Sequence, residues 1–155
     1  MTNKEVADIF YRLADLLEIK GEVIYKVVAY RRAAESIAQD DREIADLWRA
    51  GQLRTIRGVG EAIEKKIAEI LSTGRLRLLD EVRASVPEDV MTLLAVPGIG
   101  PRTARALFEK LGITTVAALE EAARKHLIRD LPGMGEKSEE NILRALEALR
   151  AQARR

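Results

Sequence analysis

The feature that most constrains the fold is a pattern of glycine, an apolar residue and glycine that occurs three times in the same surroundings. An apolar residue closes the segment before each copy, and another lies seven positions after its second glycine. The three segments are residues 53–67, 93–107 and 128–142, here called the first, second and third hairpin. Apolar residues recur at intervals of three and four within and around them, which is the period of an α-helix. The repeat therefore predicts helix pairs joined by tight glycine turns.

The rest of the chain is also expected to be helical. Glycine and proline divide it into about ten short helices, and β-branched residues do not alternate with polar ones except briefly at Val27 and Val28, inside a helical pattern. A length of 155 residues with 47% apolar content is enough for a real core. We predict an all-α protein with two small helical domains, each built around these hairpins.

Composition excludes several classes of site. There is no cysteine and one histidine, His126, so disulfides, thiol nucleophiles and clusters of histidine or cysteine around zinc are excluded. No apolar stretch approaches the roughly 20 residues that span a bilayer, and the first residues do not resemble a signal peptide. We expect a cytoplasmic protein that does not bind membranes.

Positive charge is concentrated in the middle of the chain, although the net charge is only +1. Residues 49–79 hold seven Lys and Arg against three Asp and Glu, whereas residues 1–48 hold seven against ten. The middle segment contains the first hairpin. This distribution indicates where an anionic partner would bind.

The glycine turns have the properties of a phosphate-binding element. Glycine permits unusual backbone angles and lets a ligand approach the amides closely, and each turn opens onto a helix start, where free N–H groups favour an anion. The central residues Val59, Ile99 and Met134 are expected to point inward and lock each helix pair. Backbone contacts of this kind position DNA without reading its bases.

The three segments resemble the helix-hairpin-helix family, whose hairpins bind DNA and commonly hold a potassium or sodium ion through backbone carbonyls. The resemblance implies such an ion at the carbonyls of Ile56 and Val59 and of Val96 and Ile99. The residues expected to contact DNA are Gly58, Val59, Gly60, Lys65, Gly98, Ile99, Gly100, Arg102 and Thr103. The third hairpin is expected to be mainly structural, because its second helix carries three acidic residues that would repel phosphate: Glu136, Glu139 and Glu140.

The order of segments resembles the amino-terminal region of family X DNA polymerases, the group of DNA polymerase beta. The resemblance covers nearly the whole chain. It implies a lyase-type small domain at residues 1–82 and a fingers-like domain at residues 86–150. The segments that carry it are Asn3–Phe10, Tyr25–Ala34, Ile56–Ile67, Thr73–Leu76 and the second hairpin with Leu111–Thr114.

In many family members the small domain uses a lysine to form a Schiff base with an abasic sugar and to release 5′-deoxyribose phosphate, and the matching residue is Lys66. At about 100° per residue, Lys66 falls roughly 65° from the centre of its helix's apolar stripe, whereas Lys65 lies almost opposite. A partly desolvated amine near other cations is more often neutral, as an imine-forming nucleophile requires. The alternative is an ordinary lysine whose stem covers the core edge.

The resemblance assigns the 5′-phosphate pocket to Lys26, Tyr30 and Arg54. Lys26 and Tyr30 are four residues apart on one helix, so their tips can reach one point. Tyr30 also shares a face with apolar residues, so the alternative is a core tyrosine with its hydroxyl at the rim. Where polymerase beta has a basic residue two positions after the hairpin, this chain has Ala62, which weakens the expected pocket.

Polymerase activity is not expected of this chain alone. Nucleotidyl transfer needs clustered carboxylates around two metal ions, no Asp-x-Asp occurs, and Mg²⁺ or Mn²⁺ would belong to an absent palm domain. We therefore interpret the chain as the amino-terminal part of a longer repair polymerase, without its palm domain and without the metal-dependent phosphoesterase domain that bacterial members usually add. We expect this part to bind gapped, nicked or abasic duplex as a monomer. The alternatives are a stand-alone DNA-binding module of uptake, recombination or repair, and a protein-binding helical adaptor.

Overall fold

The computed structural model describes residues 1–87 and 89–154. Over these ranges the chain forms nine α-helices and one 3-10 helix and contains no strand, so the prediction of an all-α fold is confirmed. The chain divides into two compact units, Met1–Ser85 and Val86–Arg155. The first contains one glycine hairpin and the second contains two.

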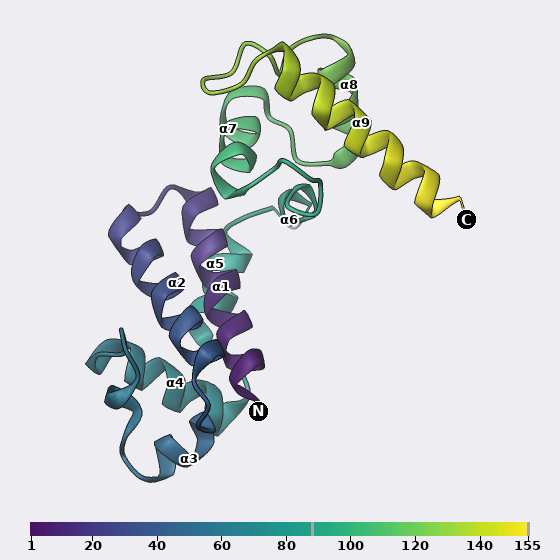
Figure 1. Cartoon of the computed structure of the whole chain (residues 1–155). Helices are drawn as coiled ribbons and strands as arrows, with labels where there is room; N and C mark the ends of the chain where they lie inside the picture. Colours follow the sequence, from purple (N-terminus) through teal and green to yellow (C-terminus); the bar gives the residue numbers. More distant parts are fainter. Residues whose placement is uncertain (88, 155) are drawn as a thin grey trace. The chain divides into compact units, whose positions relative to one another are not determined.

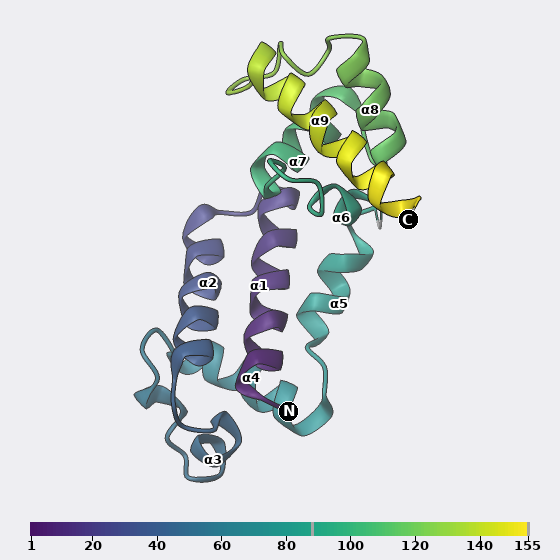
Figure 2. The same cartoon turned by 45° about the vertical axis from the view of Figure 1, so that its right-hand side comes forward.

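The first unit is built on an antiparallel pair of long helices, α1 and α2, and α5 packs against α1. In Figure 2 these three helices stand side by side with α1 in the middle. Their bounds and those of the shorter elements are α1 (Asn3–Lys20), α2 (Ile24–Gln39), α3 (Ile44–Arg49), η1 (Leu53–Thr55), α4 (Glu61–Thr73) and α5 (Arg77–Ala84).

Helix α1 has clear start and stop signals in the sequence. Thr2 and Glu5 form a capping box: the Thr2 hydroxyl accepts from the Glu5 N–H at 3.1 Å, and the Glu5 carboxylate accepts from the Thr2 N–H at 3.0 Å. The helix ends at Gly21, which has a φ of 88°, and the next N–H bonds back to the Leu17 carbonyl at 2.9 Å. Both ends are therefore satisfied by local chemistry. The apolar stripe between them is buried against α2 and α5.

The Asn3 side chain holds the connection between α2 and α3 in place. Its Nδ2 lies 2.7 Å from the Arg42 carbonyl and 3.2 and 3.3 Å from those of Ile37 and Asp40, and its Oδ1 accepts from the Ile44 N–H at 2.8 Å. An amide nitrogen has two hydrogens, so one of them is shared between two carbonyls. The first residue of α1 thus orders the segment that leads to the first hairpin.

The described residues of the second unit form four helices: α6 (Val90–Leu93), α7 (Pro101–Leu111), α8 (Val116–Arg124) and α9 (Glu136–Ala153). Helix α8 packs along α9, and α6 packs on α7; Figure 1 shows α8 behind α9. The fully buried side chains of Leu93, Leu107 and Leu119 come from α6, α7 and α8. The second hairpin joins α6 to α7, and the third leads into α9.

Across the described ranges, none of the helices combines the length and the apolar character that crossing a bilayer requires.

Candidate nucleic-acid interface

The three glycine turns have the same backbone conformation. In each, the N–H of the central apolar residue donates to the carbonyl three residues earlier: Val59 to Ile56 at 3.1 Å, Ile99 to Val96 at 3.0 Å and Met134 to Leu131 at 3.0 Å. The first glycines, Gly58, Gly98 and Gly133, have φ values of 84°, 91° and 79°. This hydrogen bond with a positive φ at the third residue defines a type II turn, and it explains why glycine stands there.

Each turn opens directly onto a helix start that no side chain caps. The second glycines, Gly60, Gly100 and Gly135, are the extended N-cap residues of α4, α7 and α9, and none of these helices has a side-chain cap hydrogen bond. A Cβ on Gly60 or Gly100 would meet no described atom within 4 Å. The N–H groups of the first turn of α4, and those of α7 from Arg102 onward because Pro101 has none, are therefore open to a ligand at the positive end of the helix dipole.

The central apolar residues differ in how deeply they are buried. Val59 and Ile99 are 6% and 5% exposed, so they lock their hairpins as the sequence predicts. Met134 is only half-buried, and the expectation of an inward plug is incomplete for the third hairpin. There the locking role falls on other residues.

Glu139 locks the third hairpin. The prediction that it repels phosphate as a surface acid was wrong, because its carboxylate is buried. It is 1% exposed, and it accepts from the Arg129 N–H at 2.9 Å and from the Arg129 guanidinium at 2.8 and 3.0 Å. His126 Nδ1 lies 2.9 Å from the same carboxylate. Burial raises the pKa of Glu139, but the hydrogen bonds from His126 and Arg129 and the guanidinium charge outweigh it and lower the pKa to about 2. Glu139 therefore fastens the start of the third hairpin to α9 and is not a surface charge.

The polar and charged side chains predicted to contact DNA are exposed or half-buried. Arg102 is exposed and Thr103 is half-buried on the first turn of α7. Lys65 is exposed on α4, but its ammonium lies 3.6 Å from the Glu61 carboxylate. Lys65 is thus partly neutralised by its own helix.

Lys66 lies at the edge of the core, beside an aromatic stack. It is half-buried, and its Nζ lies 5.9 Å from the centroid of the Tyr30 ring, within the range of a cation–π interaction. The Tyr30 ring in turn stacks on the buried Phe10 with ring centroids 6.0 Å apart. The stack holds Tyr30 between α1 and α4 and gives Lys66 a fixed neighbour.

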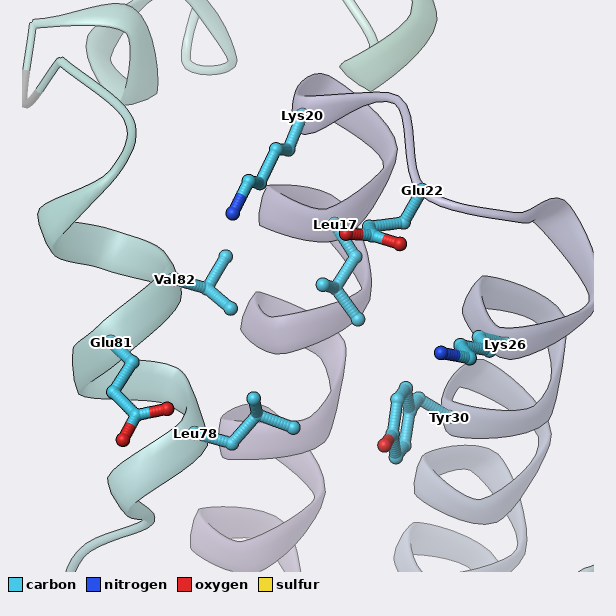
Figure 3. A pocket seen from close by; sticks show the side chains of 8 residues that line it. All are labelled: Leu17, Lys20, Glu22, Lys26, Tyr30, Leu78, Glu81 and Val82. Carbon is cyan, nitrogen blue, oxygen red and sulfur yellow. The ribbon is translucent and has the colours of Figure 1, made fainter.

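Tyr30 and Lys26 line one cavity of about 240 Å³ in the first unit. Figure 3 shows their side chains on the α2 wall, facing side chains of α1 and α5. Three further charged residues on that lining, Lys20, Glu22 and Glu81, were not predicted, and Glu81 reaches it only because α5 packs on α1. The complete lining is Leu17, Lys20, Glu22, Lys26, Tyr30, Leu78, Glu81 and Val82.

Arg54, the third residue assigned to the 5′-phosphate pocket, is not on that lining. It lies on η1 and pairs with Glu64 of α4 through an Nε to Oε1 distance of 3.1 Å. The structure therefore brings Lys26 and Tyr30 together and places Arg54 beside α4. Ala62 is exposed on the first turn of α4, so that turn presents no cation at this position.

Two of the four backbone carbonyls expected to hold a monovalent cation already accept a hydrogen bond within the turn. The carbonyls of Ile56 and Val96 each accept the turn hydrogen bond, which leaves one lone pair on each oxygen for an ion. Within the described ranges, no group of three His, Cys, Asp or Glu side chains could hold a metal. An ion at these turns would thus be bound by main-chain oxygens, as the residues present allow.

Comparisons with known proteins define the class of the chain first. A model described as "Helix-hairpin-helix domain" matches residues 1–76, and one described as "SAM-like Helix-hairpin-helix tandem" matches residues 90–148. Each unit is therefore similar to a helix-hairpin-helix family, the first to a single domain and the second to a tandem.

The relatives then give the particular group. The chain is 32% identical over 146 residues to "DNA polymerase/3'-5' exonuclease PolX" of Bacillus subtilis (strain 168), which covers 94% of this chain and 25% of that protein. It is 29% identical over 109 residues to "DNA polymerase lambda" of Arabidopsis thaliana and 28% over 123 residues to that of Rattus norvegicus, covering 70% and 74% of the chain. The chain thus matches the amino-terminal helix-hairpin-helix region of family X DNA polymerases, as its sequence predicted. It spans about a quarter or less of the length of these relatives.

Proposed function

We propose that the chain binds the sugar-phosphate backbone of DNA without reading base sequence, as the helix-hairpin-helix region of a family X repair polymerase. The expected substrate is gapped, nicked or abasic duplex. The observation that carries the proposal is the repeated turn: Gly58 to Gly60 and Gly98 to Gly100 share one conformation and each opens onto an uncapped helix start. The helix-hairpin-helix matches over both units support DNA binding.

The two turns suit phosphate better than they suit bases. Main-chain N–H groups at a helix start bind an anion whatever base it belongs to, and the open space at Gly60 and Gly100 lets a DNA strand approach them. A potassium or sodium ion at the carbonyls of Ile56 and Val59, or of Val96 and Ile99, would add positive charge between the turn and a phosphate. The third hairpin holds α8 and α9 together through Glu139 and contributes less to binding.

The test is the salt dependence of binding to gapped duplexes of two unrelated sequences, measured by fluorescence anisotropy. Each neutralised phosphate contributes about 0.9 to the slope of log K against log salt. We expect a steep slope that is equal for the two sequences. Replacing Gly58 and Gly60 with bulkier residues is expected to weaken binding to both duplexes alike. The absence of salt-sensitive binding to gapped duplex would favour a protein-binding adaptor, and selective loss on one sequence would contradict backbone binding.

A second function, 5′-deoxyribose-phosphate lyase activity through Lys66, is favoured by one specific observation. Lys66 is half-buried against Tyr30, and Tyr30 shares the cavity in Figure 3 with Lys26. The amine thus contacts the same tyrosine that shares a cavity with a cation able to bind a phosphate, although Lys66 itself is not on that lining. In the reaction, the amine adds to the C1′ aldehyde and loses water to form an imine. The C2′ proton is then lost to water and the C3′–O3′ bond breaks with the 5′-phosphate end of the DNA as the leaving group, and hydrolysis of the remaining imine releases the sugar phosphate and frees the amine.

Borohydride trapping on DNA with an incised abasic site tests this second function. Wild type and Lys65→Ala are expected to form the covalent adduct, and Lys66→Ala is not. Lys65 is the matched control because it is the adjacent lysine of the same helix but is exposed and paired with Glu61. Equal trapping by Lys66→Ala and wild type would show that Lys66 is an ordinary edge lysine.

A further inference from the structure

The three hairpins differ in where they carry a cation. At the second residue of the helix that follows the turn, the second and third hairpins have Arg102 and Lys137, and the first has Ala62. At the residue before the first glycine, the second and third hairpins have proline, and the first has Arg57. Each hairpin therefore has one basic residue at these two positions, but in the first hairpin it precedes the turn.

The remaining cations of the first hairpin already have partners. Arg54 pairs with Glu64 at 3.1 Å, and Lys65 lies 3.6 Å from Glu61. Lys66 lies over the Tyr30 ring. These contacts also neutralise both carboxylates of the first turn of α4. The positive charge left over at the turn itself is that of Arg57.

Arg57 is presented to solvent on an anchored turn. It is exposed and forms no hydrogen bond or ion pair with any described residue. The next residue, Gly58, lies against α2: a Cβ there would be 3.8 Å from the Ala33 nitrogen and 3.9 Å from the Arg32 carbonyl carbon. The corresponding positions Gly98 and Gly133 have no such neighbour. The turn that carries Arg57 is thus held on the body of the first unit.

Local chemistry favours proline at position 57. The second residue of a type II turn is the position where proline is common. The preceding residue, Ile56, has φ −76° and ψ 129°, which a following proline allows, and the Arg57 N–H donates to no described acceptor. The turn therefore does not need an arginine for its shape. The Arg57 guanidinium is therefore available to a ligand.

We propose that Arg57 is the phosphate-binding cation of the first hairpin and replaces the one missing at Ala62. This inference rests on the proposed DNA binding and adds a residue that neither the turn geometry nor the family resemblance assigns. The guanidinium offers forked N–H donors that match two oxygens of one phosphate. Its place before the turn means that the first hairpin holds its phosphate from the opposite side of the turn compared with the second.

The decisive variant is Arg57→Pro, which gives the first hairpin the proline that the other two have before the first glycine. It removes one charge while keeping a residue that suits the turn. Losing one phosphate contact is expected to reduce the salt slope on gapped duplex by about 0.9 and to weaken binding about eightfold at 0.1 M salt, with the difference vanishing toward 1 M. Arg57→Pro/Ala62→Lys moves the cation to the position used by Arg102 and is expected to restore the slope. Arg49→Ala is the control, because this exposed arginine is paired with Asp46 at 3.0 Å.

Arg57→Gln, measured in parallel, keeps an unbranched side chain and tests the charge if the proline variant folds poorly by circular dichroism. If wild type binds with a steep salt slope and both Arg57 variants keep that slope, the role of Arg57 is refuted while the proposed DNA binding stands. If the charge moved to position 62 fails to restore the slope, the two positions are not equivalent and the replacement is refuted. If wild type itself shows no salt-dependent binding, the proposed function fails.

Discussion

Glu139→Gln tests whether the buried carboxylate fastens the third hairpin. The substitution keeps the shape of the side chain but removes the charge that accepts three hydrogen bonds from Arg129. The folded pKa of Glu139 is about 2, against 4.5 for an unperturbed group. Since one pKa unit corresponds to about 1.36 kcal/mol, the carboxylate stabilises the fold by roughly 3 kcal/mol at neutral pH.

The pH dependence of this contribution has a definite sign. The pKa is lower in the folded chain than in the unfolded chain, so the stabilisation is fully present above about pH 4.5 and is lost as the pH falls toward 2. The pKa values of other carboxylates, among them Asp40 and Glu120, are also lowered, by hydrogen bonds from Arg42 and Arg124 respectively. The informative quantity is therefore the difference between wild type and Glu139→Gln, which cancels those groups.

Urea unfolding followed by circular dichroism at pH 7 and at a series of lower pH values measures that difference. We expect the variant to be less stable by about 3 kcal/mol at pH 7 and the gap to close toward pH 2. Glu140→Gln on the same helix is the control: its carboxylate is 50% exposed and lies 3.9 Å from Arg144, so its loss is expected to cost below about 1 kcal/mol. Equal stability of Glu139→Gln and wild type at pH 7, or a gap that persists at pH 2, would refute the reasoning.

Three further substitutions probe other parts of the structure. Asn3→Ala removes the amide that bonds four backbone groups, and we expect it to lower the free energy of unfolding by about 1–3 kcal/mol. Urea unfolding followed by the fluorescence of Trp48 in α3 measures the change, and the exposed Asn141→Ala is the control that should change little. Equal stability of Asn3→Ala and wild type would show that these hydrogen bonds are dispensable. Gly58→Ala places a Cβ at a φ of 84° with only ordinary contacts, so we expect backbone strain to lower the stability measured by thermal unfolding by about 1–2 kcal/mol. Gly60→Ala, in an extended conformation, is expected to lose less stability. The reverse order of the two variants would contradict the turn geometry. Thr2→Ala removes half of the capping box of α1 and is expected to cost about 1 kcal/mol, which unchanged thermal unfolding would disprove.

The fold could be predicted from the sequence because its signals are local. The three-and-four spacing of apolar residues determines the helices, and glycine at a positive φ marks the turns. The helical period also separates Lys66, which is half-buried, from the exposed Lys65. These features depend only on residues within a few positions of one another, so they can be predicted without knowledge of long-range contacts.

The parts that could not be predicted depend on contacts between distant residues. Asn3 bonds to residues 34 to 41 positions away, and Lys20 and Glu81 meet on one cavity only because α5 packs against α1. Glu139 looked like a surface acid because its helix is polar, and only its contacts with Arg129 and His126 show why it is buried. The sequence alone shows that Arg57 stands where the other two hairpins have proline. Its meaning required the ion pairs that occupy Arg54 and Lys65.

Titration of the ¹⁵N-labelled chain with gapped duplex, followed by the backbone amide signals in NMR spectra, tests backbone binding by the hairpins most directly. We predict the largest shifts at the amides of Gly58, Gly60, Gly98 and Gly100, with smaller shifts at Gly133 and Gly135, and the same pattern for two duplexes of unrelated sequence. Unmoved glycine amides in a chain that nevertheless binds DNA, or a pattern that changes with the sequence, would contradict binding through these turns.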